Sequence, residues 1–212
     1  MFLGILDEPR LNLLRRIVEN PPVANTYLAG DTALALLLEH RHSIDFDWFS
    51  PAMFAAETVT ENLSKLGSLS ISETKKGTFH GFVDGIRVAW LYYPNPLLGE
   101  LIQSPEIPGL RLASMMDIAV MKWAALSSRG CRKDFIDLYF MAKAGLEIKS
   151  LLPLLTKKFP GSNINRYHMI KSLSYFDDAE HEAWPTMCKP VKWEDVKDYF
   201  LEQQKLLLDE SL

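Results

Sequence analysis

YLAGDTALALLLEHRHSIDFDWFS, residues 27–50, contains the patterns that decide the fold. The apolar run that ends at Gly30 predicts a strand over residues 25–30. A helical pattern begins at Asp31 or Thr32 and continues through TALALLLEHR. The alternating run SIDFDWFS then predicts a second strand over residues 43–50. The segment therefore predicts a strand, a glycine corner, a helix and a second strand, in that order.

Two aspartates lie in the second predicted strand. Side chains alternate across a strand, so Asp45 and Asp47 share one face, about 6.5–7 Å apart, while Ile44, Phe46 and Trp48 point into a core. Two carboxylates held this close repel each other unless a cation lies between them. Oxygen ligands suit Mg²⁺, which also takes ligands from substrate phosphates. An exposed strand face near a loop explains the same pattern without any metal.

The glycine corner adds a second functional signal. A helix that opens beside Gly30 presents free backbone N–H groups and the positive end of its dipole, and such a corner suits a phosphate. The helix then leads the chain directly to Asp45 and Asp47. A phosphate site beside a metal pair is what nucleotidyl transfer requires, because the metal holds the phosphate during in-line attack on the α-phosphorus.

The remaining patterns divide the chain into an α/β part and a helical part. Asp84-Gly85, between two strand-like runs, predicts a tight hairpin, so the sheet is at least partly antiparallel. Beyond the segment above we expect helices over 9–19 and 52–66 and strands over 69–74, 78–83 and 86–93. After residue 112 the pattern is helical, with helices over 115–128, 132–144, 147–159, 163–172 and 192–209. The prediction is an α+β protein with an α/β domain over 1–112 and a helical domain over 113–212.

Composition excludes several classes of protein. Of 212 residues, 48% are hydrophobic and 24% charged, which is typical of a globular protein rather than a disordered or fibrous one. No apolar run is long enough to cross a bilayer, so we expect no membrane partner. The two cysteines, Cys131 and Cys188, lie far apart, which argues against a zinc ribbon or a disulfide framework and favours the cytoplasm.

The net charge of −4 is unevenly distributed. Residues 129–171 carry nine basic and three acidic side chains, and Arg129, Arg132 and Lys133 cluster where one of the predicted helices begins. This stretch could meet a nucleotide or an RNA backbone. Solvated helix faces explain it equally well, because basic residues on exposed helices are common.

Two segments together resemble a known family. YLAGDTALALLLEHRHSIDFDWFS and LASMMDIAVMKWAALSSRGCRKDFIDLYFMA are similar to the abortive-infection nucleotidyltransferases of the AbiEii/AbiGii toxin type. That family shows G-G-[ST]-A-L, a helix ending in H-R, S-[VI]-D-[FL]-D, and later a helix lysine before R-G-x-x-K-D. The resemblance implies a nucleotidyltransferase fold of the DNA polymerase beta type, with a mixed sheet, followed by a helical domain. It also implies a toxin of a toxin–antitoxin pair that transfers a nucleotidyl group from a nucleoside triphosphate to an acceptor such as tRNA.

The resemblance assigns roles to particular residues. Asp45 and Asp47 would bind Mg²⁺ and be catalytic. Lys122 and Asp134 would also be catalytic, Lys122 by neutralising the triphosphate and Asp134 by orienting Lys122 or helping to activate a hydroxyl on tRNA or protein. Gly30 and Thr32 fall on the phosphate-loop positions of the family and Lys122 on its helix lysine. Together with Asp31 of the same corner and Arg129 of the basic cluster, they are the residues expected to contact the nucleotide.

Lys122 has a second explanation. Its neighbours one helical turn away, including Ile118 and Leu126, are apolar, so its ammonium does not lie on a solvent face. Such a lysine reaches a phosphate or pairs with an acid, here Asp134 or Asp137. Those two aspartates lie one turn apart near a helix N-terminus, where the helix dipole stabilises their charge without any function.

Two departures from the family pattern support an alternative. Asp31 replaces the second glycine of the phosphate loop and would repel a triphosphate, although as an N-cap it stabilises the helix. The strand expected to supply a third metal-binding carboxylate, residues 86–93, contains no acid, and Glu73 is the other candidate. The alternative is a catalytically degenerate nucleotide-binding or interaction module with the same fold.

Overall fold

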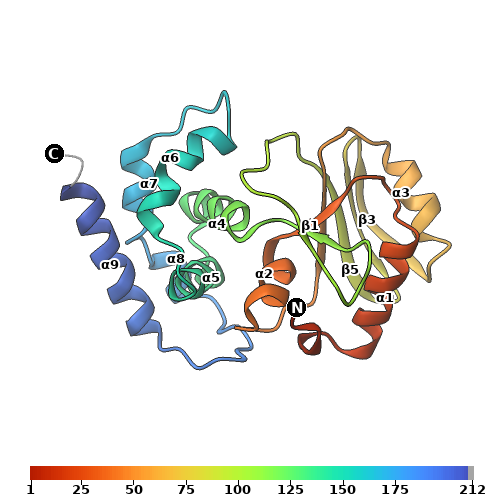
Figure 1. Ribbon diagram of the computed structural model, residues 1–212, viewed down its shortest axis with the longest axis horizontal. Coiled ribbons are helices and arrows are strands. Elements are labelled where there is room, and N and C mark those ends of the chain that lie inside the picture. The colour runs from red at the N-terminus through yellow and green to blue at the C-terminus, as the bar shows by residue number, and fades with distance from the viewer. Residues whose placement is uncertain (210–212) are drawn as a thin grey trace. The chain divides into compact units, whose positions relative to one another are not determined.

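The computed structural model describes residues 1–209, and the chain divides into two compact units (Figure 1). The sheet unit comprises Met1–Asn95 and Glu100–Ser114. The helical unit comprises Pro96–Gly99 and the chain from Met115 onward. The α+β class predicted from the sequence is confirmed, whereas the four-residue excursion at Pro96–Gly99 was not expected. The domain boundary at residue 112 stays a prediction.

Within residues 1–209, seven strands form one mixed sheet in the order β3-β4-β5-β2-β1-β7-β6. β2 is parallel to β5 and β1 is parallel to β7, while the other neighbours are antiparallel. The two short strands β6 and β7 were not expected from the sequence. The strands are β1 (Tyr27–Ala29), β2 (Phe46–Ser50), β3 (Leu69–Lys75), β4 (Thr78–Val83), β5 (Ile86–Tyr92), β6 (Ile102–Gln103) and β7 (Arg111–Leu112).

The predicted meander is present as β3-β4-β5. Its second turn is built from Asp84 and Gly85, with φ values of 51° and 79°. A type I′ turn requires positive φ at both central residues, and the Asp-Gly pair tolerates it. The hairpin prediction is therefore confirmed.

The sheet unit carries helices on both faces of the sheet. They are α1 (Glu8–Glu19), α2 (Gly30–Leu38) and α3 (Ala56–Leu63), preceded by a 3₁₀ turn, η1 (Leu3–Ile5). α1 and α3 lie on one side and α2 on the other (Figure 1). Trp48 stacks on Trp90 of β5, with ring centroids 5.8 Å apart, and Phe79 meets Trp90 edge-on. These buried aromatic side chains form part of the core of the sheet unit.

Two details around α2 differ from the prediction. The helix ends at Leu38 rather than Arg41, because Glu39 adopts a left-handed conformation with φ 52° and closes the helix. β2 correspondingly begins at Phe46, so Ile44 lies outside the strand and is 56% exposed. The expectation that Ile44 points into the core was wrong, whereas Phe46 and Trp48 are buried as expected.

The helical unit is built around α4, which packs against three other helices of this unit, α5, α6 and α7. Phe135, Phe176, Trp193 and Phe200 form an aromatic cluster in its core. The five helices expected here are present, and the short α8 is additional. The helices are α4 (Met115–Arg129), α5 (Arg132–Lys143), α6 (Ile148–Lys158), α7 (Arg166–Ser172), α8 (Asp177–Glu180) and α9 (Trp193–Asp209).

A buried ion pair fixes the excursion of the chain at Pro96–Gly99 to the helical unit. Lys158 Nζ lies 2.7 Å from Asp117 Oδ1, and both side chains are inaccessible to solvent. Asp117 also accepts hydrogen bonds from the backbone N–H groups of Leu98 and Gly99, and Lys158 donates to the Pro96 carbonyl. No helix within residues 1–209 combines the length and apolar character that crossing a bilayer requires.

Candidate functional site

The aspartate pair lies at the start of β2, in the middle of the sheet. Asp47 stands opposite Ala29 of β1 and Ala89 of β5, and Asp45 immediately precedes the strand. Both aspartates are partly exposed. The two cross-strand neighbours of Asp47 are alanines, whose side chains carry no charge or polar group. Of the two aspartates, only Asp47 lies within β2, and the shared metal-binding role of the pair stays a prediction.

Gly30 brings the corner between β1 and α2 against Asp47. Its φ of +70° is a conformation that side chains with a Cβ rarely adopt. A Cβ built on Gly30 would lie 3.3 Å from Asp47 Oδ2. The N-terminus of α2 therefore lies close to the Asp47 carboxylate, and the phosphate site beside a metal pair stays a prediction.

Thr32 is buried and its hydroxyl is already engaged. The hydroxyl donates to the Asp45 carbonyl and lies 2.7 Å from Ser43 Oγ, so it ties α2 to the segment that precedes β2. A contact from Thr32 to a phosphate would therefore come from its backbone N–H in the first turn of α2.

Asp31 lies inside the first turn of α2 and pairs with a buried arginine. The N-cap of α2 is Ala29, so the expectation that Asp31 caps the helix was wrong. Asp31 Oδ2 lies 3.3 Å from Arg41 Nη2, and the side chain of Arg41 is almost inaccessible to solvent. The positive charge of Arg41 offsets that of Asp31, which weakens the repulsion that this carboxylate would exert on a phosphate.

Sequence reasoning missed Arg87, which contacts the candidate metal pair directly. Arg87 is on β5, and its Nη1 donates to Asp45 Oδ2 over 3.0 Å. Its spacing from Ala89 and Leu91 would have placed it on one face of a strand. The sequence did not indicate that this strand pairs with β2 in parallel, and without that pairing the contact with Asp45 could not be foreseen.

A third carboxylate does not lie beside the pair in the neighbouring strand. In the register of the sheet, Ala89 stands next to Asp47, followed outward by His80 of β4 and Glu73 of β3. Three strand spacings separate Glu73 from Asp47, or about 14 Å. Glu73 is also paired with Lys75 at 2.9 Å, a hydrogen bond that holds the pKa of its carboxyl below the ordinary value. Glu73 therefore cannot complete the site.

The donor set fits a hard divalent cation. Asp47 of β2 faces the Gly30 corner, and Asp45 immediately precedes the same strand, so one short segment carries two carboxylates. Mg²⁺ commonly uses one or two carboxylates and takes its other ligands from water and substrate phosphates. Two carboxylates without a third are consistent with a cation that arrives together with a nucleotide.

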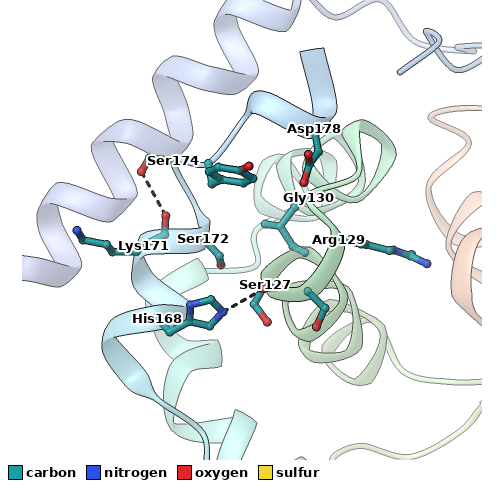
Figure 2. Close-up of a pocket in the computed structure, with 11 residues that line it drawn as sticks. Ser127, Arg129, Gly130, His168, Lys171, Ser172, Ser174 and Asp178 are labelled. Atoms are coloured by element: carbon teal, nitrogen blue, oxygen red, sulfur yellow. Dashed lines mark hydrogen bonds between the residues drawn. The ribbon is translucent and has the colours of Figure 1, made fainter. Parts of the chain in front are cut away.

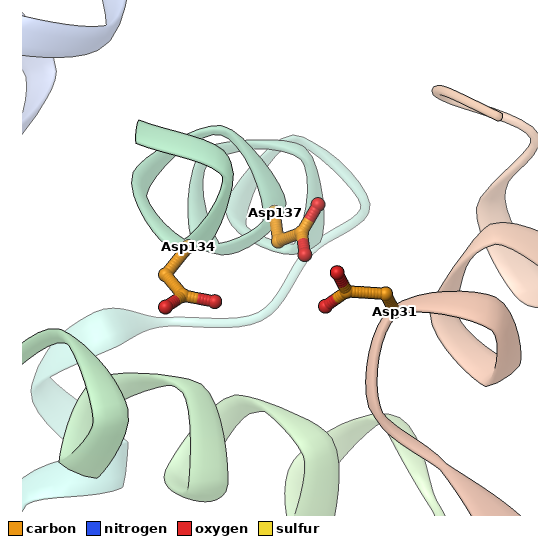
Figure 3. Close-up of side chains that lie close together, drawn as sticks. All are labelled: Asp31, Asp134 and Asp137. Carbon is orange, nitrogen blue, oxygen red and sulfur yellow. The ribbon is translucent and has the colours of Figure 1, made fainter. Parts of the chain in front are cut away.

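The helical unit contains a second acidic cluster. Asp134 and Asp137 project from one face of α5 (Figure 3). Lys122 Nζ lies 2.8 Å from Asp134 Oδ1 and 2.6 Å from Asp137 Oδ2, and Arg129 Nε and Nη2 both donate to Asp134 Oδ2. Lys122 is 4% exposed and both aspartates are completely buried. The ion pair that the sequence offered as the structural explanation of Lys122 is thus present with both aspartates.

Arg129, the other residue expected to contact the nucleotide, also borders a hollow of about 400 Å³ in the helical unit. Its side chain points away from the hollow, whereas His168 points toward it and lies 3.0 Å from the Ser127 carbonyl (Figure 2). The guanidinium of Arg129 therefore contributes to the cluster around Asp134 rather than to this hollow.

No family model matches the chain. It is 34% identical over 207 residues to the uncharacterized protein aq_aa25 of Aquifex aeolicus, covering 96% of this chain and 98% of that protein.

Two solved structures share the fold. The nucleotidyltransferase toxin MenT4 of Mycobacterium tuberculosis superimposes with a TM-score of 0.59 at 15% identity, covering 96% of this chain and 86% of that one. A protein from H. pylori, provisionally described as a nucleotidyltransferase, gives a TM-score of 0.58 at 18% identity, covering 97% of each chain. The resemblance to toxin-type nucleotidyltransferases is confirmed at the level of the fold. The chain belongs to one family with aq_aa25, and its fold is that of the nucleotidyltransferases.

Proposed function

We propose that this protein is a metal-dependent nucleotidyltransferase, which transfers a nucleotidyl group from a nucleoside triphosphate to a hydroxyl of tRNA or of a protein. The observation that carries the proposal is the close approach of the Gly30 corner to Asp47, the second residue of β2, with Asp45 just before the strand. A phosphate-binding corner and a carboxylate pair on one strand are what a magnesium–nucleotide requires. The fold shared with MenT4 supports the same class of reaction.

In this proposal, different residues of the sheet unit bind the cation and the phosphates. Asp45 and Asp47 would hold the cation, which would supply Lewis-acid chemistry at the α-phosphate and at the attacking hydroxyl. Gly30 and the backbone N–H groups of Asp31 and Thr32 hold phosphate oxygens at the N-terminus of α2. Asp31 does not disqualify the corner, because Arg41 offsets its charge.

In the same proposal, Lys122 and Asp134 take the roles that the sequence resemblance implies, and Arg129 takes the role suggested by the basic cluster at the start of α5. In the proposal the ammonium of Lys122 neutralises triphosphate charge while Asp134 orients it, and the ion pair of 2.8 Å supports such orientation. Arg129 holds the opposite oxygen of Asp134 and binds the nucleotide in the same proposal. The proposal also includes a toxin role with a cognate antitoxin, which the shared fold with the toxin MenT4 supports, and action in the cytoplasm.

Calorimetry with each of the four nucleoside triphosphates, with and without Mg²⁺, tests the proposal. The site variant is Asp45→Asn/Asp47→Asn. Its matched control is Glu57→Gln/Glu61→Gln, which removes two exposed charges from α3 on the opposite side of the sheet. We expect Mg²⁺-dependent binding of at least one triphosphate, abolished in the site variant and retained in the control.

A degenerate module is the second candidate function. Two features favour this alternative. Arg87 already pairs with Asp45, and the residue of β5 beside Asp47 is Ala89 rather than an acid. A folded wild-type protein that binds no triphosphate at millimolar concentration, with or without metal, would decide in its favour.

A further inference from the structure

Arg87 occupies the position on β5 that lies next to Asp45 in the parallel pairing with β2. The register joins Phe46 to Val88, so the preceding residues, Asp45 and Arg87, are neighbours. In the antiparallel direction Arg87 stands opposite Phe82 of β4. The backbone of Arg87 is therefore fixed beside Asp45 by strand pairing and does not depend on a loop.

The contact between Arg87 and Asp45 is of a kind that exchanges readily. A hydrogen bond of 3.0 Å joins Nη1 of Arg87 to Oδ2 of Asp45, and the side chains are 47% and 34% exposed. Ion pairs this exposed are weak, because water competes for both charges. A divalent cation at Asp45 therefore displaces the guanidinium at little cost, and the long arginine side chain can move while its backbone stays in β5.

We propose that Arg87 is an exchangeable counter-ion: it holds Asp45 when no metal is bound, and it binds phosphate oxygens of the nucleotide once Asp45 has bound the cation. The inference rests on the proposed function, because it assigns a partner to the same site. A guanidinium suits both states, since its planar fork pairs with carboxylate and with phosphate. Arg87 is accordingly a positioning and phosphate-binding residue rather than a metal ligand.

This exchange predicts that removing Arg87 has opposite effects on two ligands. A metal alone competes with the guanidinium for Asp45, so its binding should tighten when the guanidinium is absent. A metal–polyphosphate gains a contact from the released guanidinium, so its binding should weaken. A residue that only stabilised the fold would not change the two affinities in opposite directions.

The first measurement uses Mn²⁺ alone, followed by electron paramagnetic resonance, on wild type and Arg87→Met. We expect Arg87→Met to bind Mn²⁺ about two- to tenfold more tightly, in line with the weakness of exposed ion pairs. Detectable binding in the variant but not in wild type would support the proposal in the same way. Equal or weaker binding in the variant, or no binding by either protein, overturns the proposal.

The second measurement uses Mg²⁺ with inorganic tripolyphosphate, which removes the unknown base from the experiment. We expect Arg87→Met to weaken binding about tenfold or more, because hydrogen bonds between charged groups are strong. Arg87→Lys should recover part of the affinity, since a lysine keeps the charge without the fork. Unchanged or tighter binding by Arg87→Met overturns the proposal.

Arg16→Met is the matched control. Arg16 forms an exposed ion pair with Asp84 at 2.9 Å, with similar side-chain exposures of 40% and 41%, but it lies on α1, on the other side of the sheet. This variant should change neither affinity. Failure of the proposed function looks different from failure of the exchange: in the first case wild type binds no triphosphate, and in the second wild type binds it and Arg87→Met binds it equally well.

Discussion

The two units of this protein each contain a pair of aspartates with basic partners, and the two pairs differ in exposure. Asp45 and Asp47 are partly open to water, and the arginine on Asp45 is itself half exposed. Asp134 and Asp137 are completely buried, and Lys122 bridges them. The same residue types therefore make an exchangeable arrangement in the sheet unit and a fixed one in the helical unit.

The difference follows from the cost of removing a charge from water. An exposed pair contributes about 0–1 kcal/mol, since solvent screens it and replaces either partner. Removing one partner of a buried pair leaves an uncompensated charge and costs about 3–5 kcal/mol. The sheet unit can thus give up a contact to a ligand, whereas the helical unit cannot lose one without losing stability.

Lys122→Met should give the largest effect. It takes the ammonium away from both aspartates and leaves Arg129 paired with Asp134, so we expect the free energy of unfolding to fall by about 3–5 kcal/mol. Urea denaturation monitored by circular dichroism measures it. Lys149→Met on α6, whose exposed lysine lies 4.0 Å from Glu147, is the control and should change stability by less than about 0.5 kcal/mol. A loss below about 1 kcal/mol for Lys122→Met would remove the contrast between the two pairs.

Gly30→Ala should have the next largest effect, and Gly85→Ala is its matched control. Both glycines have positive φ, +70° and +79°, but a Cβ at Gly85 meets nothing within 4 Å, whereas one at Gly30 lies 3.3 Å from Asp47 Oδ2. We expect losses of about 2 kcal/mol at Gly30 and about 1 kcal/mol at Gly85, measured by thermal unfolding. Gly30→Ala/Asp47→Ala should recover the excess, and equal losses at the two glycines would mean that the corner does not press on Asp47.

Asp45→Asn/Asp47→Asn should leave stability nearly unchanged. Removing two like charges relieves their repulsion while it removes the exposed pair with Arg87, so the two contributions oppose each other. We expect a change within about 1 kcal/mol in either direction, by the same urea titration as for Lys122→Met. A loss comparable to that of Lys122→Met would show that the aspartates of β2 are structural, and it would count against an exchangeable site.

Local patterns in the sequence predicted the sheet unit well where one segment carried all the information. The Asp84-Gly85 turn was correct because two adjacent residues meet its φ requirement. The approach of the Gly30 corner to Asp47 could also be foreseen, since α2 alone separates the corner from the segment that leads into β2. Ile44 failed because alternation was extended beyond the true start of β2, where the chain is not yet in the sheet.

The parts that could not be predicted depend on which distant segments become neighbours. Arg87 contacts Asp45 only because β5 pairs with β2 in parallel, and no local pattern encodes that pairing. The sequence pattern predicted that the helix ends at Arg41. In the structure the helix is capped by Glu39, and the buried Arg41 forms an ion pair with Asp31. β6 and β7 are two residues each, too short to produce any alternation. The order of the strands likewise places Glu73 of β3 too far from Asp47 to serve as a third carboxylate.

Asp84 is an aspartate at an exposed turn, and its substitution should have the smallest effect on stability. A hydrogen bond from Arg16, and then one from the Ser68 backbone N–H, hold the pKa of Asp84 below its ordinary value of 3.8. A folded-state pKa below the unfolded one stabilises the protein above the unfolded pKa, and this contribution is lost as pH falls through the folded pKa. We therefore expect stability linked to Asp84 at pH 7 and its progressive loss below about pH 4.

Asp84→Asn measures that contribution by comparison with wild type at several pH values. After solvent screening we expect a difference of at most about 0.5 kcal/mol at pH 7, which shrinks as the pH is lowered below about 4. Thermal unfolding of both proteins across this range provides the measurement. A difference that stays constant with pH would mean that the turn depends on the shape of the side chain and not on its charge. Asp84 would then differ from the two aspartate pairs, Asp45 with Asp47 and Asp134 with Asp137, whose proposed roles all depend on charge.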